Sequence, residues 1–204
     1  MMPGLLDDLF CLETGSTAAT SCVACGATGA TLRCDDCFNS GCFCVACINS
    51  KHEVMPFHRR RRWTGLYFVP ERFRVEVSLG HAGARCASAP FIPVQMEIAH
   101  VTGVFDVDLY PCKCPAAGVG EERILPRQLM RHGLMPGSLD AKNVSWAFTM
   151  TLMDDWLAAS HYAKVSIMDY WSALWFKTLG TPPERVSIFI FIFLLFVRRR
   201  VELS

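Results

Sequence analysis

The sequence predicts an α+β protein in which an N-terminal cross-braced zinc-binding module is followed by a small antiparallel β-sheet and then by C-terminal helices. Three observations support this prediction. Eight of the eleven cysteines lie between Cys11 and Cys47. Apolar and polar residues alternate with a period of two after Trp63, which is typical of strands, and apolar residues recur at helical spacing after Cys114.

Composition and charge exclude several classes of protein. The chain has 204 residues with 20 Lys+Arg and 19 Asp+Glu, so its formal net charge is +1. This balance argues against a globally basic nucleic-acid binder and against an acidic solvating tail. Hydrophobic residues make up 51% and charged residues 19%, which argues against disorder of the whole chain. A charged partner would therefore have to meet a local patch.

The start of the chain bears on the state of the cysteines. It has neither the basic n-region nor the apolar h-region of a secretory signal. We therefore expect an intracellular protein with reduced thiols, in which close cysteine pairs bind metal rather than form disulfides. We interpret residues 1–21 as a flexible leader. In the module that follows, residues 22–62, apolar side chains are scarce, and such a segment needs a bound metal to fold.

Four pairs of metal-ligand residues follow one another in this module. A C-x2-C turn lets two thiolates reach one tetrahedral Zn²⁺, and eight ligands complete two four-coordinate sites. The pairs are Cys22/Cys25, Cys34/Cys37, Cys44/Cys47 and His52/His58. Because four protein ligands fill a zinc site, both sites suit a structural role and leave no open position for catalysis.

The four pairs can be combined in two ways. The preferred, cross-braced assignment places Cys22, Cys25, Cys44 and Cys47 in one site and Cys34, Cys37, His52 and His58 in the other. A sequential alternative joins the first two pairs and then the last two, and spacing alone allows both. Cys42 could replace Cys44 as a ligand, but only Cys44 has the x2 spacing to Cys47. Cys11 is interpreted as a plain thiol.

Residues 63–114 predict a β-rich region of about four strands. Alternation is clear over residues 73–79, 94–98 and 105–109, and a further strand is predicted over Thr64–Val69. Ligand-type residues follow two of these strands. If the strand ends are neighbours, His81, Cys86, Cys112 and Cys114 could close a third zinc site. The alternative is that these cysteines are buried thiols beside a surface histidine.

Residues 115–180 predict a helical region. Helices are expected over Leu125–His132 and Ser145–Ala159, and a third opens at Ser166 with Asp169 in a capping-box variant and ends before Gly180. Four tryptophans occur at helical spacing among Met and Leu residues: Trp146, Trp156, Trp171 and Trp175. We interpret them as core residues rather than as a platform for stacking bases.

The last segment, residues 181–204, is an atypical apolar tail. Its apolar run from Ile188 to Val197 is ten residues long, whereas a bilayer needs about 20, so no membrane span is predicted. The composition changes abruptly after Arg185, and Val186-Ser187 can be encoded by GTGAGT, a common intron donor sequence. We therefore hypothesise that the tail is a mistranslated intron.

Four consecutive arginines, Arg59, Arg60, Arg61 and Arg62, directly follow the last proposed ligand of the module. Arginine binds phosphate oxygens bidentately, so these residues could contact DNA or serve as a nuclear-import patch. The alternative interpretation is a solvated basic loop.

The order of these motifs resembles a known family. The stretches that carry the resemblance are Arg33–Phe38, Cys44–Cys47, Trp63–Gly65, Leu79–His81, Cys112–Cys114 and Gln128–Arg131. Over about residues 20–180 the chain resembles the CxC2-like cysteine cluster associated with KDZ (Kyakuja, Dileera and Zisupton) transposases. The resemblance implies a zinc-binding region that lies N-terminal to a transposase catalytic domain. It supports the eight paired Cys and His residues of the module as ligands, and it makes a chance grouping of His81, Cys86, Cys112 and Cys114 less credible.

The resemblance also implies where catalysis would lie. Such transposases use an RNase H-like domain with three widely spaced acidic residues, and we expect that domain to be absent from this chain, which is therefore not predicted to be an enzyme. Asp154-Asp155 is a candidate carboxylate pair for catalysis. Adjacent side chains on a helix point about 100° apart, so we interpret the pair as part of a solvated helix face.

The predicted function is a non-catalytic zinc-binding region of a KDZ-transposase-like protein that engages transposon DNA or chromatin in the nucleus. The alternative is a protein–protein interaction module, because interleaved Cys/His pairs also resemble B-box and ZZ fingers. Two zinc ions are expected, with a third at the β-rich region, and no small-molecule substrate.

Overall fold

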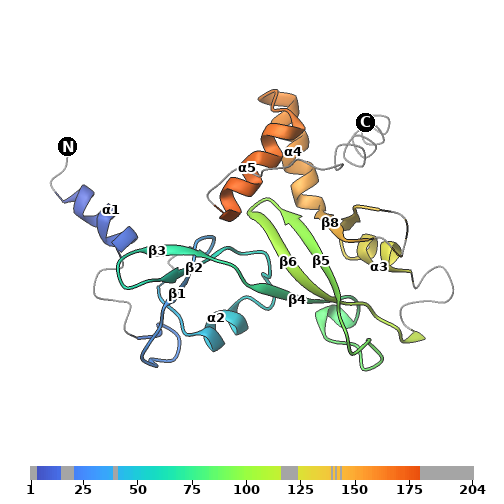
Figure 1. Cartoon of the computed structure of the whole chain (residues 1–204), viewed down its shortest axis with the longest axis horizontal. Coiled ribbons are helices and arrows are strands. Elements are labelled where there is room, and N and C mark those ends of the chain that lie inside the picture. Colours follow the sequence, from blue (N-terminus) through green and yellow to red (C-terminus); the bar gives the residue numbers. More distant parts are fainter. Residues whose placement is uncertain are drawn as a thin grey trace. The chain divides into compact units, whose positions relative to one another are not determined.

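The computed structural model of the chain describes residues 4–14, 21–38, 41–115, 124–138, 140, 142 and 144–179 (Figure 1). The chain divides into two compact units, Met1–Arg72 and Phe73–Ser204. Both units contain helices and a sheet, so the predicted α+β class is confirmed. The apolar tail with its proposed intron, residues 181–204, lies outside the described residues.

The first unit is built on a three-stranded antiparallel sheet. Its strands β1 (Leu32–Cys34), β2 (Arg60–Trp63) and β3 (Phe68–Glu71) lie in the order β1-β2-β3, and helix α2 (Val45–Lys51) contacts β1. The strand predicted over Thr64–Val69 begins only at Phe68. The backbone N–H and the hydroxyl of Thr64 both donate to the carbonyl oxygen of Tyr67, which makes residues 64–67 the turn between β2 and β3.

The core of the first unit is small. Apart from cysteines, its buried apolar residues are Ala30, Leu32, Phe43, Ile48 and Phe68. Two of the buried cysteines, Cys22 and Cys42, belong to the same cluster. So few apolar side chains provide little hydrophobic stabilisation, as expected for a segment that depends on metal.

An additional helix, α1 (Leu5–Thr14), lies in the segment that the sequence analysis assigns to a flexible leader. The sequence analysis predicted no helix for these ten residues. They contain no Gly or Pro, and Asp7 and Asp8 in the first turn interact favourably with the positive end of the helix dipole. The sequence analysis considered the polar composition of residues 1–21 as a whole, and it therefore did not predict this local helix.

The second unit contains a five-stranded sheet in the order β4-β6-β5-β8-β7. The strands are β4 (Arg74–Ser78), β5 (Val94–His100), β6 (Gly103–Tyr110), β7 (Leu134–Pro136) and β8 (Trp146–Thr149). The pairs β5–β6 and β7–β8 are antiparallel, whereas β4–β6 and β5–β8 are parallel. The sheet is therefore mixed rather than wholly antiparallel, because β4 joins the outer edge of β6 and not its sequence neighbour β5.

Among the residues that the structure describes, the α-helices that accompany this sheet are α3 (Leu125–Arg131), α4 (Met150–Tyr162) and α5 (Ile167–Leu179), the last two drawn in orange in Figure 1. The helix predicted from Ser145 begins only at Met150, because the backbone of residues 146–149 pairs with β5 and β7 as strand β8. The Thr149 hydroxyl caps α4 by accepting from the Leu152 N–H at 3.3 Å. The predicted cap at Ser166 is confirmed, since its hydroxyl accepts from the Asp169 N–H at 3.1 Å.

The core of the second unit lies between the sheet and helices α4 and α5. Phe148, Leu152, Trp156, Trp171 and Leu174 are buried in it, and Trp146 and Trp175 pack against them. The four tryptophans thus have the predicted core role. Within the part of the chain that the structure describes, no helix combines the length and apolar character needed to cross a membrane.

Candidate metal centres

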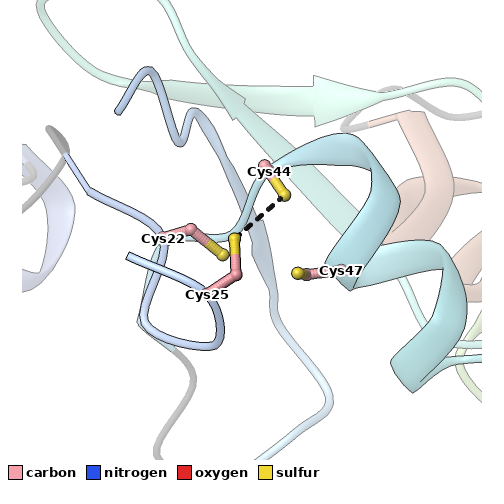
Figure 2. Close-up of side chains that lie close together, drawn as sticks. All are labelled: Cys22, Cys25, Cys44 and Cys47. Carbon is pink, nitrogen blue, oxygen red and sulfur yellow. Dashed lines mark hydrogen bonds between the residues drawn. The ribbon is translucent and has the colours of Figure 1, made fainter. Parts of the chain in front are cut away.

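The first Cys/His group brings together Cys22, Cys25, Cys44 and Cys47, whose sulfurs all lie within 4.8 Å of one another. Figure 2 shows the four side chains pointing toward a common centre, two from a loop and two from the start of helix α2. The Sγ atoms of Cys25 and Cys44 are 3.9 Å apart. Because a tetrahedral site with Zn–S bonds of 2.3 Å places its sulfurs about 3.8 Å apart, this spacing fits zinc.

Local backbone structure places these four thiols. The loop that carries Cys22 and Cys25 closes on itself, because the Gly26 N–H donates to the Cys22 carbonyl oxygen at 2.8 Å. Gly26 has a φ of +75°, a conformation that glycine adopts without strain. On the other side, Cys44 is the N-cap of α2 and Cys47 lies in its first turn, so both thiols meet the loop from one helix end.

The second group brings together Cys34, Cys37, His52 and His58, again with all ligand atoms within 4.8 Å. The Sγ of Cys37 is 3.3 Å from Nε2 of His52 and 3.4 Å from Nδ1 of His58, and the Sγ of Cys34 is 3.6 Å from the same His58 nitrogen. Sulfur and nitrogen ligands of one tetrahedral zinc ion are about 3.6 Å apart, so this group also fits the metal.

The buried His52 is oriented by its second ring nitrogen. Its Nδ1 donates to the Ile48 carbonyl oxygen at 2.7 Å, one turn earlier in the chain. This hydrogen bond fixes the neutral tautomer in which Nε2 carries a lone pair that faces Cys37. Burial lowers the pKa of His52, which also favours the neutral, metal-binding form.

The two groups alternate along the chain, which is the cross-braced arrangement. Each takes one pair of cysteines from before residue 40 and one pair of ligand residues from after it. Cys42, the spare cysteine, is buried in the apolar cluster of the first unit and belongs to neither group. Cys11 lies exposed on α1.

The third group brings together His81, Cys86, Cys112 and Cys114 in the second unit. The Nε2 of His81 is 3.5 Å from the Sγ of Cys112 and 3.3 Å from that of Cys114, and these two sulfurs are 3.3 Å apart. His81 begins the short 3-10 helix η1 (His81–Gly83) after β4, and Cys112 follows β6. The parallel pairing of β4 and β6 brings these strand ends side by side.

Gly80 is needed at this third group for two reasons. Its φ is +102°, which other residues rarely adopt. A Cβ atom at this position would also lie 3.1 Å from the Cβ of Cys112. A side chain here would therefore be strained and would push Cys112 by a few tenths of an ångström.

Helix α3 holds both strands that carry the third group, a feature that sequence analysis missed. The buried side-chain amide of Gln128 accepts from the Cys112 N–H at 2.8 Å and donates to the Cys112 carbonyl oxygen at 3.0 Å. One turn later, His132 Nε2 accepts from the Gly80 N–H at 2.8 Å, and its Nδ1 donates to the Gln128 carbonyl oxygen. We call Gln128 and His132 the α3 clamp.

The thiols of the groups have strongly divergent pKa values. Backbone hydrogen bonds, that of Cys44 first, lower the pKa of Cys22 to about 6, while hydrogen bonds with the Cys44, Cys25 and Cys22 thiols raise the pKa of Cys47 to about 12. In the third group, burial raises the pKa of Cys112 to about 11. A divalent cation bound at such a group would take the place of the thiol protons.

The four arginines lie at the start of β2 and within it rather than in a solvated loop. Each makes a polar contact inside the first unit: Arg59 with Asp36, Arg60 with Asn49, Arg61 with Asp35 and Arg62 with Glu71. Because β2 pairs with β1 on one side and β3 on the other, the directions of the arginine side chains within it are set. Three of the four positive charges are therefore compensated by carboxylates of the same unit.

The carboxylate pair Asp154-Asp155 lies on the exposed face of α4, where the sequence analysis placed it. Asp155 accepts a hydrogen bond from the Tyr170 hydroxyl of α5 at 2.5 Å. This contact joins the two helices, so Asp155 has a structural partner.

The class of protein to which this fold and these centres belong follows from a match to a family model. The model of the CxC2 like cysteine cluster associated with KDZ transposases matches residues 71–181, which is more than half of the chain. No curated protein and no solved structure matches the chain.

The chain belongs to this family of CxC2-like cysteine clusters, which are accessory cysteine-rich domains rather than catalytic ones. The match contains the third group and the α3 clamp. It begins after the first two groups, whereas the sequence analysis expected the resemblance to start near residue 20.

Proposed function

We propose that this chain is a non-catalytic, zinc-stabilised accessory region of a KDZ-transposase-like protein. The observation that carries the proposal is that three separate groups each supply four Cys or His ligand atoms within 4.8 Å of one another. Four-coordinate sites made of thiolate and imidazole ligands favour zinc among the common divalent ions. A site with four protein ligands has no open position for water or substrate, so its role is structural.

The partner proposed first for this region is transposon DNA or chromatin, which places the protein in the nucleus. Membership of a transposase-associated family supports this partner. The arginines of β2 and Arg59 just before it are the candidates for contact with phosphate. For such contact, Arg59, Arg61 and Arg62 would have to exchange their carboxylate partners for phosphate. We therefore expect modest affinity, with few phosphates neutralised.

A protein partner is the second candidate, and the pairing of the arginines favours it. With these charges compensated, the first unit presents exposed apolar side chains instead, including Phe38, Val54 and Leu66, which are 92%, 86% and 77% exposed. Where such side chains adjoin one another, they favour contacts with another protein.

Binding of the full, zinc-loaded chain to labelled double-stranded DNA over a salt series separates the two candidates. A phosphate reader loses affinity linearly on a log–log plot, by about one unit of slope for each phosphate neutralised. Arg62→Ala should reduce that slope by about one, and it touches no Cys/His group. A chain that holds its zinc but binds no DNA at the lowest salt contradicts the DNA proposal and favours a protein partner.

A further inference from the structure

The turn that joins two ligands of the second group is acidic. Asp35 and Asp36 occupy the two positions between Cys34 and Cys37, so two carboxylates lie beside two thiols. Contacts that hold the turn between two ligands also orient the ligands. Here these contacts come from the arginine run.

Arg59 holds Asp36 through both its side chain and its backbone. Its Nη2 donates to Oδ1 of Asp36 at 2.6 Å, its Nε lies 3.2 Å from both carboxylate oxygens, and its backbone N–H donates to Oδ2 at 2.6 Å. The Asp36 side chain is only 12% exposed. The contact is thus a partly buried, forked ion pair, which is the strong and directional kind.

Arg61 holds the other carboxylate. Its Nε lies 2.7 Å from Oδ2 of Asp35, and Arg33 approaches Oδ1 of the same residue at 3.5 Å. Arg33 and Arg61 are direct neighbours across β1 and β2, where two like charges would repel each other. Asp35 forms ion pairs with both arginines. Its backbone N–H also donates to the Arg59 carbonyl oxygen at 3.1 Å.

We propose that Arg59 and Arg61 are positioning residues of the second metal centre, which fix the Cys34–Cys37 turn through Asp36 and Asp35. The inference rests on the proposed zinc binding of that group. It gives the arginine run a role other than contact with nucleic acid. Partners of this kind, one shell outside the ligands, hold the ligands in the geometry that the metal requires.

The chain offers a matched control in Arg62. This residue also lies in β2 and also pairs with both oxygens of a carboxylate, that of Glu71 in β3. Glu71 is no neighbour of the ligand residues in the sequence. Arg62→Ala therefore removes one positive charge and one ion pair from the same strand without touching the acidic turn.

The test is Co²⁺ binding to the full chain, followed by absorption, with competition by Zn²⁺. The second group offers two thiolates and two imidazoles. The first group offers four thiolates, and the third offers three thiolates and one imidazole. Because the ligand sets differ, the d–d bands of Co²⁺ at the second group are distinguishable. We expect Arg59→Ala to weaken Co²⁺ binding at the second group by about 10–100-fold. Arg59→Lys should restore part of the affinity, since it keeps the charge but loses the fork.

Two further variants keep the outcome decisive. Asp36→Asn keeps the shape of the turn, removes its charge and should weaken Co²⁺ binding at the same site as Arg59→Ala. The double variant, Arg59→Ala with Asp36→Asn, should lose no more Co²⁺ affinity than either single variant. Equal Co²⁺ affinity in Arg59→Ala and Arg62→Ala overturns the inference.

Cys37→Ala separates this failure from failure of the proposed function. It should lower the number of bound ions by one. If it leaves both that number and the d–d bands unchanged, the second group holds no metal and the proposed function fails there.

Discussion

At the scale of single residues, two cysteines separated by one position differ in what their thiols face, although both contact the apolar cluster of the first unit. Cys42 lies in the apolar cluster of the first unit, where burial raises the pKa of its thiol. Cys44 begins α2 and faces Cys25 across the first group. Their roles therefore differ, although composition and spacing made both candidates for the same ligand position.

This difference predicts opposite outcomes for one substitution. Cys44→Ser should remove one zinc ion per chain, because a hydroxyl replaces a thiolate ligand. Cys42→Ser should keep the full number of zinc ions but lower stability by about 1–3 kcal/mol, because it buries a hydroxyl in an apolar cluster. Metal analysis and denaturant unfolding measure the two effects. Loss of zinc in Cys42→Ser alone would reverse the assignment.

Residue spacing predicts which Cys and His side chains the structure brings together, but it does not predict the contacts that support them. The x2 spacings identify cysteine pairs because one turn of backbone fixes the distance between two thiols. The contacts of Asp35 and Asp36 with Arg61 and Arg59 join positions more than twenty residues apart, and no local period encodes them. An acidic pair inside a C-x2-C turn and a basic run just beyond the last ligand were the available signal.

At the scale of elements, helix α3 decides how the third group is held. Its Gln128 contacts Cys112 through two hydrogen bonds and its His132 contacts the residue before His81. Both side chains lie on one face because they are four positions apart. The seven-residue helix therefore fixes two strand ends at once.

The α3 clamp predicts a selective loss of metal at the third group. Gln128→Leu removes both hydrogen bonds to Cys112 while keeping an apolar side chain of similar size, and metal affinity at this group should fall by about 10–100-fold. Met130→Ala, on the exposed side of the same helix, is the control and should leave it unchanged. Zinc transfer to a chromophoric chelator measures both. Equal transfer from the two variants would assign Gln128 to the fold alone.

Element boundaries show where sequence patterns reach their limit. Residues 146–149 continue the apolar spacing of the helix behind them, yet they form β8 because β5 and β7 provide partners on both sides. In the same way, β4 pairs in parallel with β6 and not with β5, its neighbour in the sequence. Both outcomes depend on partners distant in sequence, which periodicity does not reveal.

At the scale of the whole molecule, the two units differ in how much of their stability metal must provide. The first unit has a small apolar cluster and two Cys/His groups, whereas the second has a large cluster around Phe148, Trp156 and Trp171 and one group at a sheet end. Structural zinc contributes on the order of 10–16 kcal/mol to the folding of a small finger. The same metal loss therefore has unequal consequences.

Chelation should unfold the first unit and spare the core of the second. With zinc removed under reducing conditions, we expect amide hydrogens of residues 22–62 to exchange rapidly, because no apolar core of sufficient size replaces the lost ligand bonds. Amides near Cys112 should also gain exchange, while those of α4 and α5 around Trp156 and Trp171 stay protected by burial. Hydrogen exchange read by mass spectrometry, with zinc added back as the control, measures each segment in one experiment. Unchanged protection of residues 22–62 after complete zinc removal would mean that the small apolar cluster suffices, and that the Cys/His groups of the first unit do not hold its fold.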